Sequence, residues 1–214
     1  MGPRITMLVL PLVVLGVSRL GMEVSFRLLP MRGALMGGLA AYYLAIAASV
    51  LWVRKRVPGA QRAPSLRSGR RPSARRVFLA IVLPALPLAV FFLLHLAPVA
   101  PALAIAAVVF AAVNASFEET FWRGLMAHLP APDGIRILYP AALFSFMHWF
   151  NMAPYVALGA GTYAVLVTST FALGVVWMWF QLREGSLLYP IASHFAIDAF
   201  ALVALVMSLQ PSLL

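Results

Sequence analysis

Six ionisable side chains in the second half of the chain stand inside or beside long apolar runs. They are Glu118, Glu119, Arg123, His148, His194 and Asp198. An ionisable group at the centre of a membrane-spanning helix costs about 2.5–3.5 kcal/mol on insertion scales, so several of them together require compensation. Carboxyl and imidazole groups that face one another can hold and deprotonate a water molecule. We therefore expect these side chains to form one paired cluster that carries acid–base chemistry.

Helical spacing separates the roles of the two neighbouring acids. Glu118 and Glu119 point about 100° apart on a helix, so one cannot do the work of the other. Glu119 and Arg123 stand at i and i+4 with the acid first, which predicts an ion pair between them. This pair leaves Glu118 as the carboxylate that faces the interior of the bundle, with Asn114 one turn earlier on the same face.

Two more pairs at i and i+4 complete the pattern. Phe144 and His148 share one face of a later helix, and His194 and Asp198 share one face of the last helix. Taken singly, each of these His residues is compatible with an ordinary helix-packing contact. Helices that present such faces to Glu118 predict instead a dry pocket around one water molecule.

A metal ion is the alternative to a water molecule held by protein groups alone. The side chains of Glu118, His148, His194 and Asp198 are ligands that could bind Zn²⁺. No helix carries two His residues in the HExxH spacing that is typical of zinc proteases. We therefore favour a water molecule that is held by protein groups alone, without a metal or another cofactor. The chain contains no cysteine, which excludes thiolate nucleophiles and Cys-ligated metals.

The elements that must position these residues are membrane-spanning helices. Hydrophobic residues make up 63% of the 214 residues and charged residues 10%, with a mean hydropathy of +0.95. Soluble domains carry about 25% charged residues. We expect an all-α polytopic transmembrane bundle that forms one membrane-embedded domain over residues 1–214, with about seven spans (six to eight) of roughly 20 residues each. The expected spans are 5–29, 33–53, 77–97, 100–117 with an amphipathic continuation to residue 128, 137–153, 156–180 and 187–209.

The basic residues indicate how the chain is oriented. The net charge is +10, and nine of the sixteen Lys and Arg lie in residues 54–76, between two apolar runs. The positive-inside rule predicts a poorly ordered cytoplasmic loop that contacts anionic lipid rather than nucleic acid. The site then opens toward the cytoplasm, and the expected location is a prokaryotic inner membrane. Near the N-terminus, Arg19, Glu23 and Arg27 recur at four-residue spacing, which predicts that Glu23 pairs with one of the two arginines.

Three short motifs follow one another on successive predicted helices. Residues 118–123 read EExxxR, residues 144–148 read FxxxH and residues 194–198 read HxxxD. In this order they resemble the motifs of the CPBP family, which contains the CAAX proteases and the bacteriocin-processing enzymes. The resemblance covers residues 114–200. It implies a glutamic-type intramembrane endopeptidase that cleaves a membrane-anchored or lipidated peptide or protein.

The resemblance also implies a role for each matching position. Glu118 would be the general base, and His148 would help to hold or activate the water. His194 and Asp198 would stabilise the oxyanion of the tetrahedral intermediate, and the ion pair predicted above would support the base. The last motif position is often Asn in CAAX-processing members. An ionised Asp cannot donate to an oxyanion, so Asp198 would have to be protonated, orient His194 or help to bind a metal.

Two other functions are compatible with the same residues. A non-catalytic bacteriocin-immunity or peptide-binding membrane protein would keep its phenotype when Glu118 is replaced. An ion- or proton-coupled transporter would favour internal repeats and interrupted helices in matched halves, and the sequence shows neither. Prenylated C-termini, leader peptides and C-terminal sorting signals are all compatible substrates of a protease.

Overall fold

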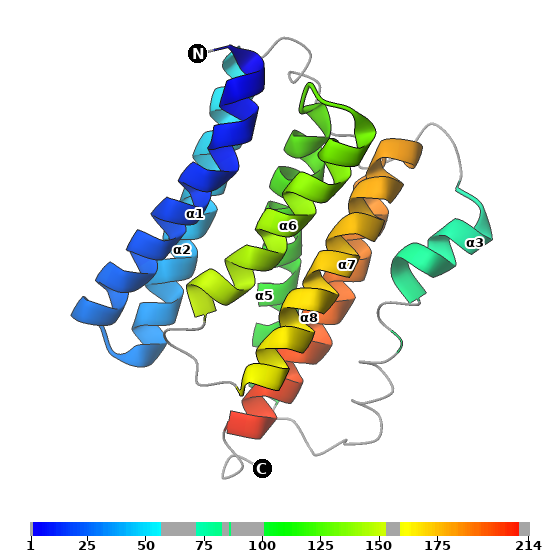
Figure 1. The fold of residues 1–214 in the computed structure, drawn as a ribbon. Helices are drawn as coiled ribbons and strands as arrows, with labels where there is room; N and C mark the ends of the chain where they lie inside the picture. Colours follow the sequence, from blue (N-terminus) through cyan, green and yellow to red (C-terminus); the bar gives the residue numbers. More distant parts are fainter. Residues whose placement is uncertain (1, 57–71, 83–85, 87–100, 153–158, 210–214) are drawn as a thin grey trace. The chain divides into compact units, whose positions relative to one another are not determined.

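The computed structural model describes residues 2–56, 72–82, 86, 101–152 and 159–209 (Figure 1). Nearly all of these residues are helical, and none of them is in a strand. The elements in chain order are α1 (Pro3–Leu28), α2 (Met31–Arg56), α3 (Ala74–Val77), η1 (Phe78–Val82), α5 (Pro101–Glu119), η2 (Thr120–Leu125), η3 (Met126–His128), α6 (Asp133–Met152), α7 (Ala160–Glu184) and α8 (Leu188–Leu209). The all-α prediction is confirmed.

Four helical segments are long and apolar enough to cross a bilayer, among the residues that the structure describes. They are Arg4–Leu28, Gly33–Arg56, Ala104–His128 and Ala160–Glu184. Helices α6 and α8 cover two further predicted spans, 137–153 and 187–209. Most of the span predicted at 77–97, and the interior of the basic loop at 57–71, lie outside the described residues. The chain is an integral membrane protein built from helices.

Two predictions about the helices were wrong. One concerns the residue at which α6 begins, and the other concerns the burial of the segment that follows α5. Helix α6 begins at Asp133, before the predicted residue 137. The Asp133 carboxylate stands in the first turn, where the helix dipole favours an acid, and accepts a hydrogen bond from Arg136 at 3.0 Å. The continuation to His128 exists, but it is not amphipathic, because every residue from Phe121 to Ala127 is buried. It also changes from an α-helix to a π-helical turn and then a 3₁₀ turn.

The chain divides into two compact units. The first unit contains Met1–Pro64 and Phe121–Trp179. The second unit contains Ser65–Thr120 and Phe180–Leu214. In the first unit, α1 packs along α2 and also contacts α6. In the second unit, α5 packs against α8.

Polar contacts fix α1 to α6 inside the first unit. Asn151 Nδ2 donates to Ser18 Oγ at 2.8 Å, and Arg19 Nη1 donates to the carbonyl oxygen of Phe150 at 3.1 Å. Glu23 and Arg27 form an ion pair at 2.5 Å, which confirms the pairing predicted for Glu23. Of the three charged residues at four-residue spacing near the N-terminus, Arg19 therefore binds another helix.

Helices α1 and α2 lie side by side as a hairpin (Figure 1), and they approach closely at small residues. A Cβ atom added at Gly21 of α1 would lie 2.3 Å from the Cβ atom of Ala41 in α2. Small residues at such positions allow membrane helices to pack backbone against backbone. Gly16, on the same helix, has no atom within 4 Å of an added Cβ atom. Alanine substitutions at Gly21 and Gly16 can therefore distinguish an effect on packing from an effect on helix propensity.

We expect Gly21→Ala to lower the free energy of unfolding by about 1–3 kcal/mol, because the added methyl group overpacks the α1–α2 contact. Gly16→Ala is the matched control and should be neutral or slightly stabilising, since alanine is the better helix former. Thermal unfolding of both variants in detergent micelles measures the difference. Equal stability of the two variants would show that the Gly21–Ala41 contact does not hold the hairpin together.

Candidate active site

Helix α5 packs against α8 in the second unit, and small residues recur among the buried positions of α5. Ala107, Ala111 and Ala115 recur at every fourth position of α5, and all three are buried. Asn114 and Glu118 lie next to this alanine stripe and are also buried. Because the alanines occupy little space, α8 can approach closely enough for short polar side chains to bridge the two helices. The sequence of α5 thus builds a tight interface with polar groups at one end.

The start of α8 is set by the turn that precedes it. Helix α7 ends at Glu184, and Gly185 follows with φ of 66°, a left-handed conformation that glycine adopts without strain. The hydroxyl of Ser186 accepts a hydrogen bond from the backbone N–H of Leu188 at 3.3 Å. This cap fixes the first turn of α8. The position of His194, less than two turns later, follows from it.

Three carboxyl groups surround the imidazole ring of His194 in the second unit. His194 Nδ1 lies 2.8 Å from Glu119 Oε1. On the other side of the ring, His194 Nε2 lies 3.5 Å from Glu118 Oε2 and 3.4 Å from Asp198 Oδ2. Glu118, Glu119 and His194 are all buried. Asn114 Nδ2 donates to Asp198 Oδ2 at 2.8 Å.

This arrangement implies a shared proton. A neutral imidazole has one N–H group and one lone pair, whereas both nitrogens of His194 face carboxyl oxygens. Either the ring is an imidazolium that donates on both sides, or one carboxyl group carries the proton that the ring lacks. In both cases the cluster holds a proton between groups of different basicity. Proton transfer to and from a reacting molecule requires such a group.

A second arrangement of predicted residues lies in the first unit. His148 Nδ1 lies 2.8 Å from the carbonyl oxygen of Phe144, and a carbonyl only accepts, so Nδ1 is the donor. In the neutral ring this leaves Nε2 as the basic nitrogen. The ring of Phe144 also contacts His148 edge to face at 4.7 Å between centroids. The FxxxH motif therefore fixes both the tautomer and the tilt of His148.

The buried guanidinium of Arg123 lies between two aromatic rings of the same unit. Its Cζ atom is 4.3 Å from the ring centroid of Phe144 and 4.9 Å from that of Trp177. Gly174 leaves room for it, since a Cβ atom there would lie 3.4 Å from Arg123 Nη2 and 3.0 Å from the Cβ atom of Ala141. Aromatic faces are favourable partners for a cation that has no access to water.

We expect Arg123→Lys to lower the thermal midpoint of unfolding, because an ammonium cannot stack as a planar guanidinium does and a buried cation–π contact contributes about 2 kcal/mol. Arg183→Lys is the control, since Arg183 is exposed. Thermal unfolding in detergent micelles compares the two variants. The same midpoint for Arg123→Lys as for the wild type would contradict a stabilising role for the stacked guanidinium.

Each predicted site residue thus has a place in one of the two units. The second unit brings together Asn114, Glu118, Glu119, His194 and Asp198. The first unit brings together Arg123, Phe144 and His148. The expected Glu119–Arg123 ion pair and the approach of His148 to Glu118 join residues of different units, and both stay predictions.

Sequence reasoning missed the contact between Glu119 and His194. It assigned Glu119 to Arg123 alone and gave the bundle-facing role to Glu118. Two adjacent acids that point about 100° apart can still reach the two nitrogens of one imidazole, because those nitrogens lie on different edges of the ring. The two adjacent glutamates in the sequence could therefore have predicted that both acids contact one imidazole. No sequence pattern indicated that Trp177 lies beside Arg123.

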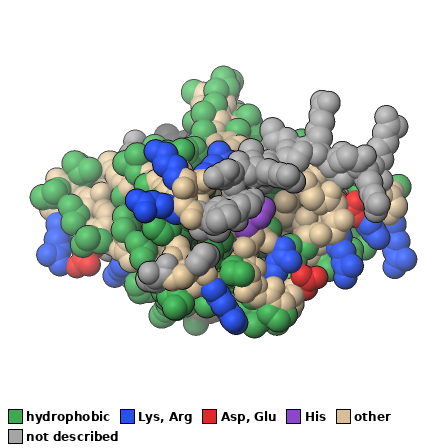
Figure 2. Space-filling view, turned by 90° about the horizontal axis from the view of Figure 1, so that it is seen from above, with side chains coloured by type: hydrophobic (Ala, Val, Ile, Leu, Met, Phe, Trp, Pro, Cys, Tyr) green, Lys and Arg blue, Asp and Glu red, His purple; other side chains and the backbone are tan. Residues whose placement is uncertain are grey.

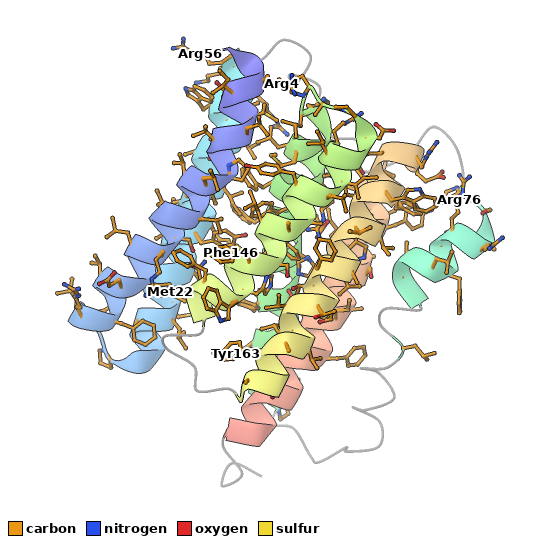
Figure 3. All side chains as sticks on the ribbon, in the orientation of Figure 1. Arg4, Met22, Arg56, Arg76, Phe146 and Tyr163 are labelled. Carbon is orange, nitrogen blue, oxygen red and sulfur yellow. The ribbon has the colours of Figure 1, made fainter. Side chains whose placement is uncertain are left out.

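Two further features bear on what the protein could bind. Among the residues that the structure describes, no three His, Asp or Glu side chains are arranged as ligands of one metal ion. An open apolar groove of about 720 Å³ lies between α6 and α7 in the first unit, where Figure 3 labels Phe146 and Tyr163. Its lining suits hydrocarbon: Ala142, Ser145, Phe146, Trp149, Tyr163, Ala164, Val167, Thr168 and Phe171.

Comparison with known proteins agrees with the three motifs. Residues 98–200 match the family model described as "Type II CAAX prenyl endopeptidase Rce1-like". The matched segment contains all the site residues named above. No curated protein and no solved structure matches the chain. Residues 98–200 are therefore similar to the Rce1-like type II CAAX prenyl endopeptidases, the group that the order of the three motifs predicted.

Proposed function

We propose that this protein is an intramembrane endopeptidase that cleaves a membrane-anchored or lipidated peptide by attack of a glutamate-activated water. The observation that carries the proposal is the cluster of Glu118, Glu119 and Asp198 around the buried ring of His194. Its position inside the segment that matches a protease family supports the same function. Peptide hydrolysis needs groups that accept and donate protons. The buried cluster provides carboxylates, an imidazole and a proton shared between them.

In the proposed reaction Glu118 is the general base. Its carboxylate takes a proton from the water while the water oxygen bonds to the carbonyl carbon of the scissile peptide. The tetrahedral intermediate then breaks its C–N bond, and the proton held by Glu118 passes to the leaving nitrogen. The products are a new carboxyl terminus and a new amino terminus. The role that the motif resemblance implies for His148 is to hold the same water in line for attack, through the Nε2 atom that its contact with Phe144 leaves basic.

His194 is proposed to stabilise the negative oxygen of the intermediate. Glu119 holds the ring through Nδ1, so that Nε2 points to the side of Glu118 and Asp198. An N–H group fixed in this way donates to the developing oxyanion without first reorganising. Glu119 is thus a positioning residue in this mechanism, in addition to its predicted pairing with Arg123.

The orientation in the membrane is proposed from the distribution of charge. Arg4 and Arg56 lie at the same end of the α1–α2 hairpin (Figure 3). On the face of the molecule shown in Figure 2, Lys and Arg side chains are more frequent than Asp and Glu. By the positive-inside rule this end and the 54–76 loop are cytoplasmic, in contact with anionic lipid. We place the protein in a prokaryotic inner membrane, with its site open to the cytoplasm.

Quantitative analysis of membrane-protein termini tests the proposed function even though the substrate is not identified. Cells that carry the wild type should contain new C-termini, paired with new N-termini, that are lost in cells carrying Glu118→Gln. Glu23→Gln is the matched control, since Glu23 binds Arg27 at the surface. Identical termini in all three strains, at equal protein levels, would reject a protease and favour a peptide-binding protein.

The proposed mechanism uses no metal, and this gives a separate prediction. Cleavage by the purified protein in liposomes should continue at an unchanged rate after incubation with EDTA or 1,10-phenanthroline. Activity that is lost to the chelators and restored by Zn²⁺ would instead assign Glu118, His148, His194 and Asp198 as ligands. In that case the role of Glu118 as a free base would be wrong.

A further inference from the structure

One contact in the second unit that the proposed mechanism does not use joins α5 to α8. Asn114 Nδ2 donates a hydrogen bond of 2.8 Å to Asp198 Oδ2. Asn114 is buried, and Asp198 lies one helical turn after His194 on the same face of α8. The same Oδ2 atom lies 3.4 Å from His194 Nε2. One carboxyl oxygen therefore faces an amide donor from one helix and an imidazole nitrogen from the other.

The chemistry of the Asn114 amide indicates which role Asp198 has in this contact. An amide N–H can only donate, so Oδ2 of Asp198 acts as an acceptor in this contact. An ionised carboxylate has no hydrogen to give to an oxyanion. The contact therefore disfavours Oδ2 of Asp198 as the oxygen that donates to the substrate. It favours the role of an acceptor that attracts the N–H of His194.

We propose that Asn114 is a positioning residue that acts through Asp198 on His194. Its amide holds the Asp198 carboxylate at the Nε2 edge of the imidazole, opposite the contact that Glu119 makes with Nδ1. The ring is then fixed from both edges by acidic groups. This inference rests on the proposed peptidase function for its effect on rate, but its effect on the imidazole is independent of that function.

A packing role alone would predict a different set of results. If the amide only joined α5 to α8, any hydrogen-bonding pair at positions 114 and 198 would serve equally well. The double substitution Asn114→Asp with Asp198→Asn keeps one amide and one carboxylate across the interface. It moves the carboxylate away from the position that faces His194. The exchange therefore separates the hydrogen bond between helices from the acceptor beside the imidazole.

The test combines kinetics, thermal unfolding and ¹⁵N NMR of histidine-labelled protein in detergent micelles. The His194 resonances are assigned by their loss in His194→Asn. We expect Asn114→Ala to lower kcat by about 10- to 100-fold with KM unchanged, as a misplaced catalytic group does. The Nε2 resonance of His194 should shift, while that of His148 stays in place. The exchanged double variant should recover the wild-type melting temperature but not the wild-type kcat or the wild-type Nε2 shift.

Three outcomes would overturn the proposal. They are an unchanged Nε2 resonance in Asn114→Ala, a kcat that falls only in proportion to the folded fraction, and full recovery of kcat in the exchanged variant. The NMR result also separates this inference from the proposed function. A shifted His194 resonance in Asn114→Ala, together with a wild-type protein that cleaves no peptide, would refute the peptidase and leave the positioning role of Asn114 in place.

Discussion

Replacement of Glu118 by Gln is expected to lower kcat by about 10²- to 10⁴-fold, the range that a positioned general base contributes. Gln has nearly the same shape as Glu and can still accept a hydrogen bond, but it cannot take a proton from water. The binding of substrate should change little, so the loss should appear in kcat rather than in KM. Steady-state kinetics with the wild type and the variant in liposomes measures both constants on a substrate found from its new termini.

The control for this prediction must show that the fold survives. The variant should melt at or above the wild-type temperature, because removing one of three clustered carboxylates relieves repulsion inside the site. Glu23→Gln should keep full activity, since Glu23 lies on α1 and binds Arg27. A Glu118→Gln variant that keeps more than about a tenth of the wild-type kcat would contradict a general-base role.

The second large effect is expected at His194. His194→Asn removes the proposed oxyanion donor, which costs about 10²- to 10³-fold in kcat at comparable sites. It should also destabilise the fold, because the acids around the ring lose the group that faces all three of them. Removing one partner from a buried charged cluster costs about 3–5 kcal/mol. Kinetics and thermal unfolding of the same preparation should therefore both change.

A double substitution separates these two consequences. Adding Glu118→Gln to His194→Asn should recover part of the lost stability, since one acidic group fewer is left without the ring, and should recover no activity. His128→Asn is the matched single control, because His128 is exposed at the end of η3. If Glu118→Gln changes the stability by the same amount in the His194→Asn background as in the wild type, Glu118 and His194 do not interact in the folded protein.

The membrane helices could be predicted well because hydropathy and length determine them. The first two spans were expected at 5–29 and 33–53, and the helices occupy Pro3–Leu28 and Met31–Arg56. The start of α6 was missed because an apolar window ignores Asp133, whose effect is electrostatic. The burial of residues Phe121 to Ala127 was not predicted, because an Arg in a helix usually indicates a face that is exposed to solvent. Here aromatic rings cover Arg123 instead.

The types of residue in the candidate site could be predicted from the sequence, but most of the pairs that they form could not. Spacing at i and i+4 correctly placed His194 beside Asp198, a local relation within one helix. The contact of Glu119 with His194 joins residues far apart in the chain, and no local spacing encodes which nitrogen meets which acid. The hydrogen bond from Asn114 to Asp198 is of the same kind. Such pairings depend on the rotation of α5 against α8, which the alanine stripe permits but a sequence pattern does not specify.

The proposed mechanism requires Glu118 and His148 to act on one water molecule. We therefore predict that their reacting atoms lie within roughly 6 Å of each other, two hydrogen bonds through one water. The chain has no cysteine, so a pair of introduced thiols can be cross-linked without background. The pair Glu118→Cys with His148→Cys is compared with Glu118→Cys with Trp149→Cys. Trp149 is exposed and points about 100° away from His148 on α6.

Cross-linking with a bifunctional maleimide of about 10 Å reach, in native membranes, should join the first pair rapidly, because that reach exceeds two hydrogen bonds through one water. The second pair should stay unlinked under the same conditions. Cross-linking of the Trp149 pair in place of the His148 pair would mean that His148 faces lipid, and the proposed water site would then be wrong.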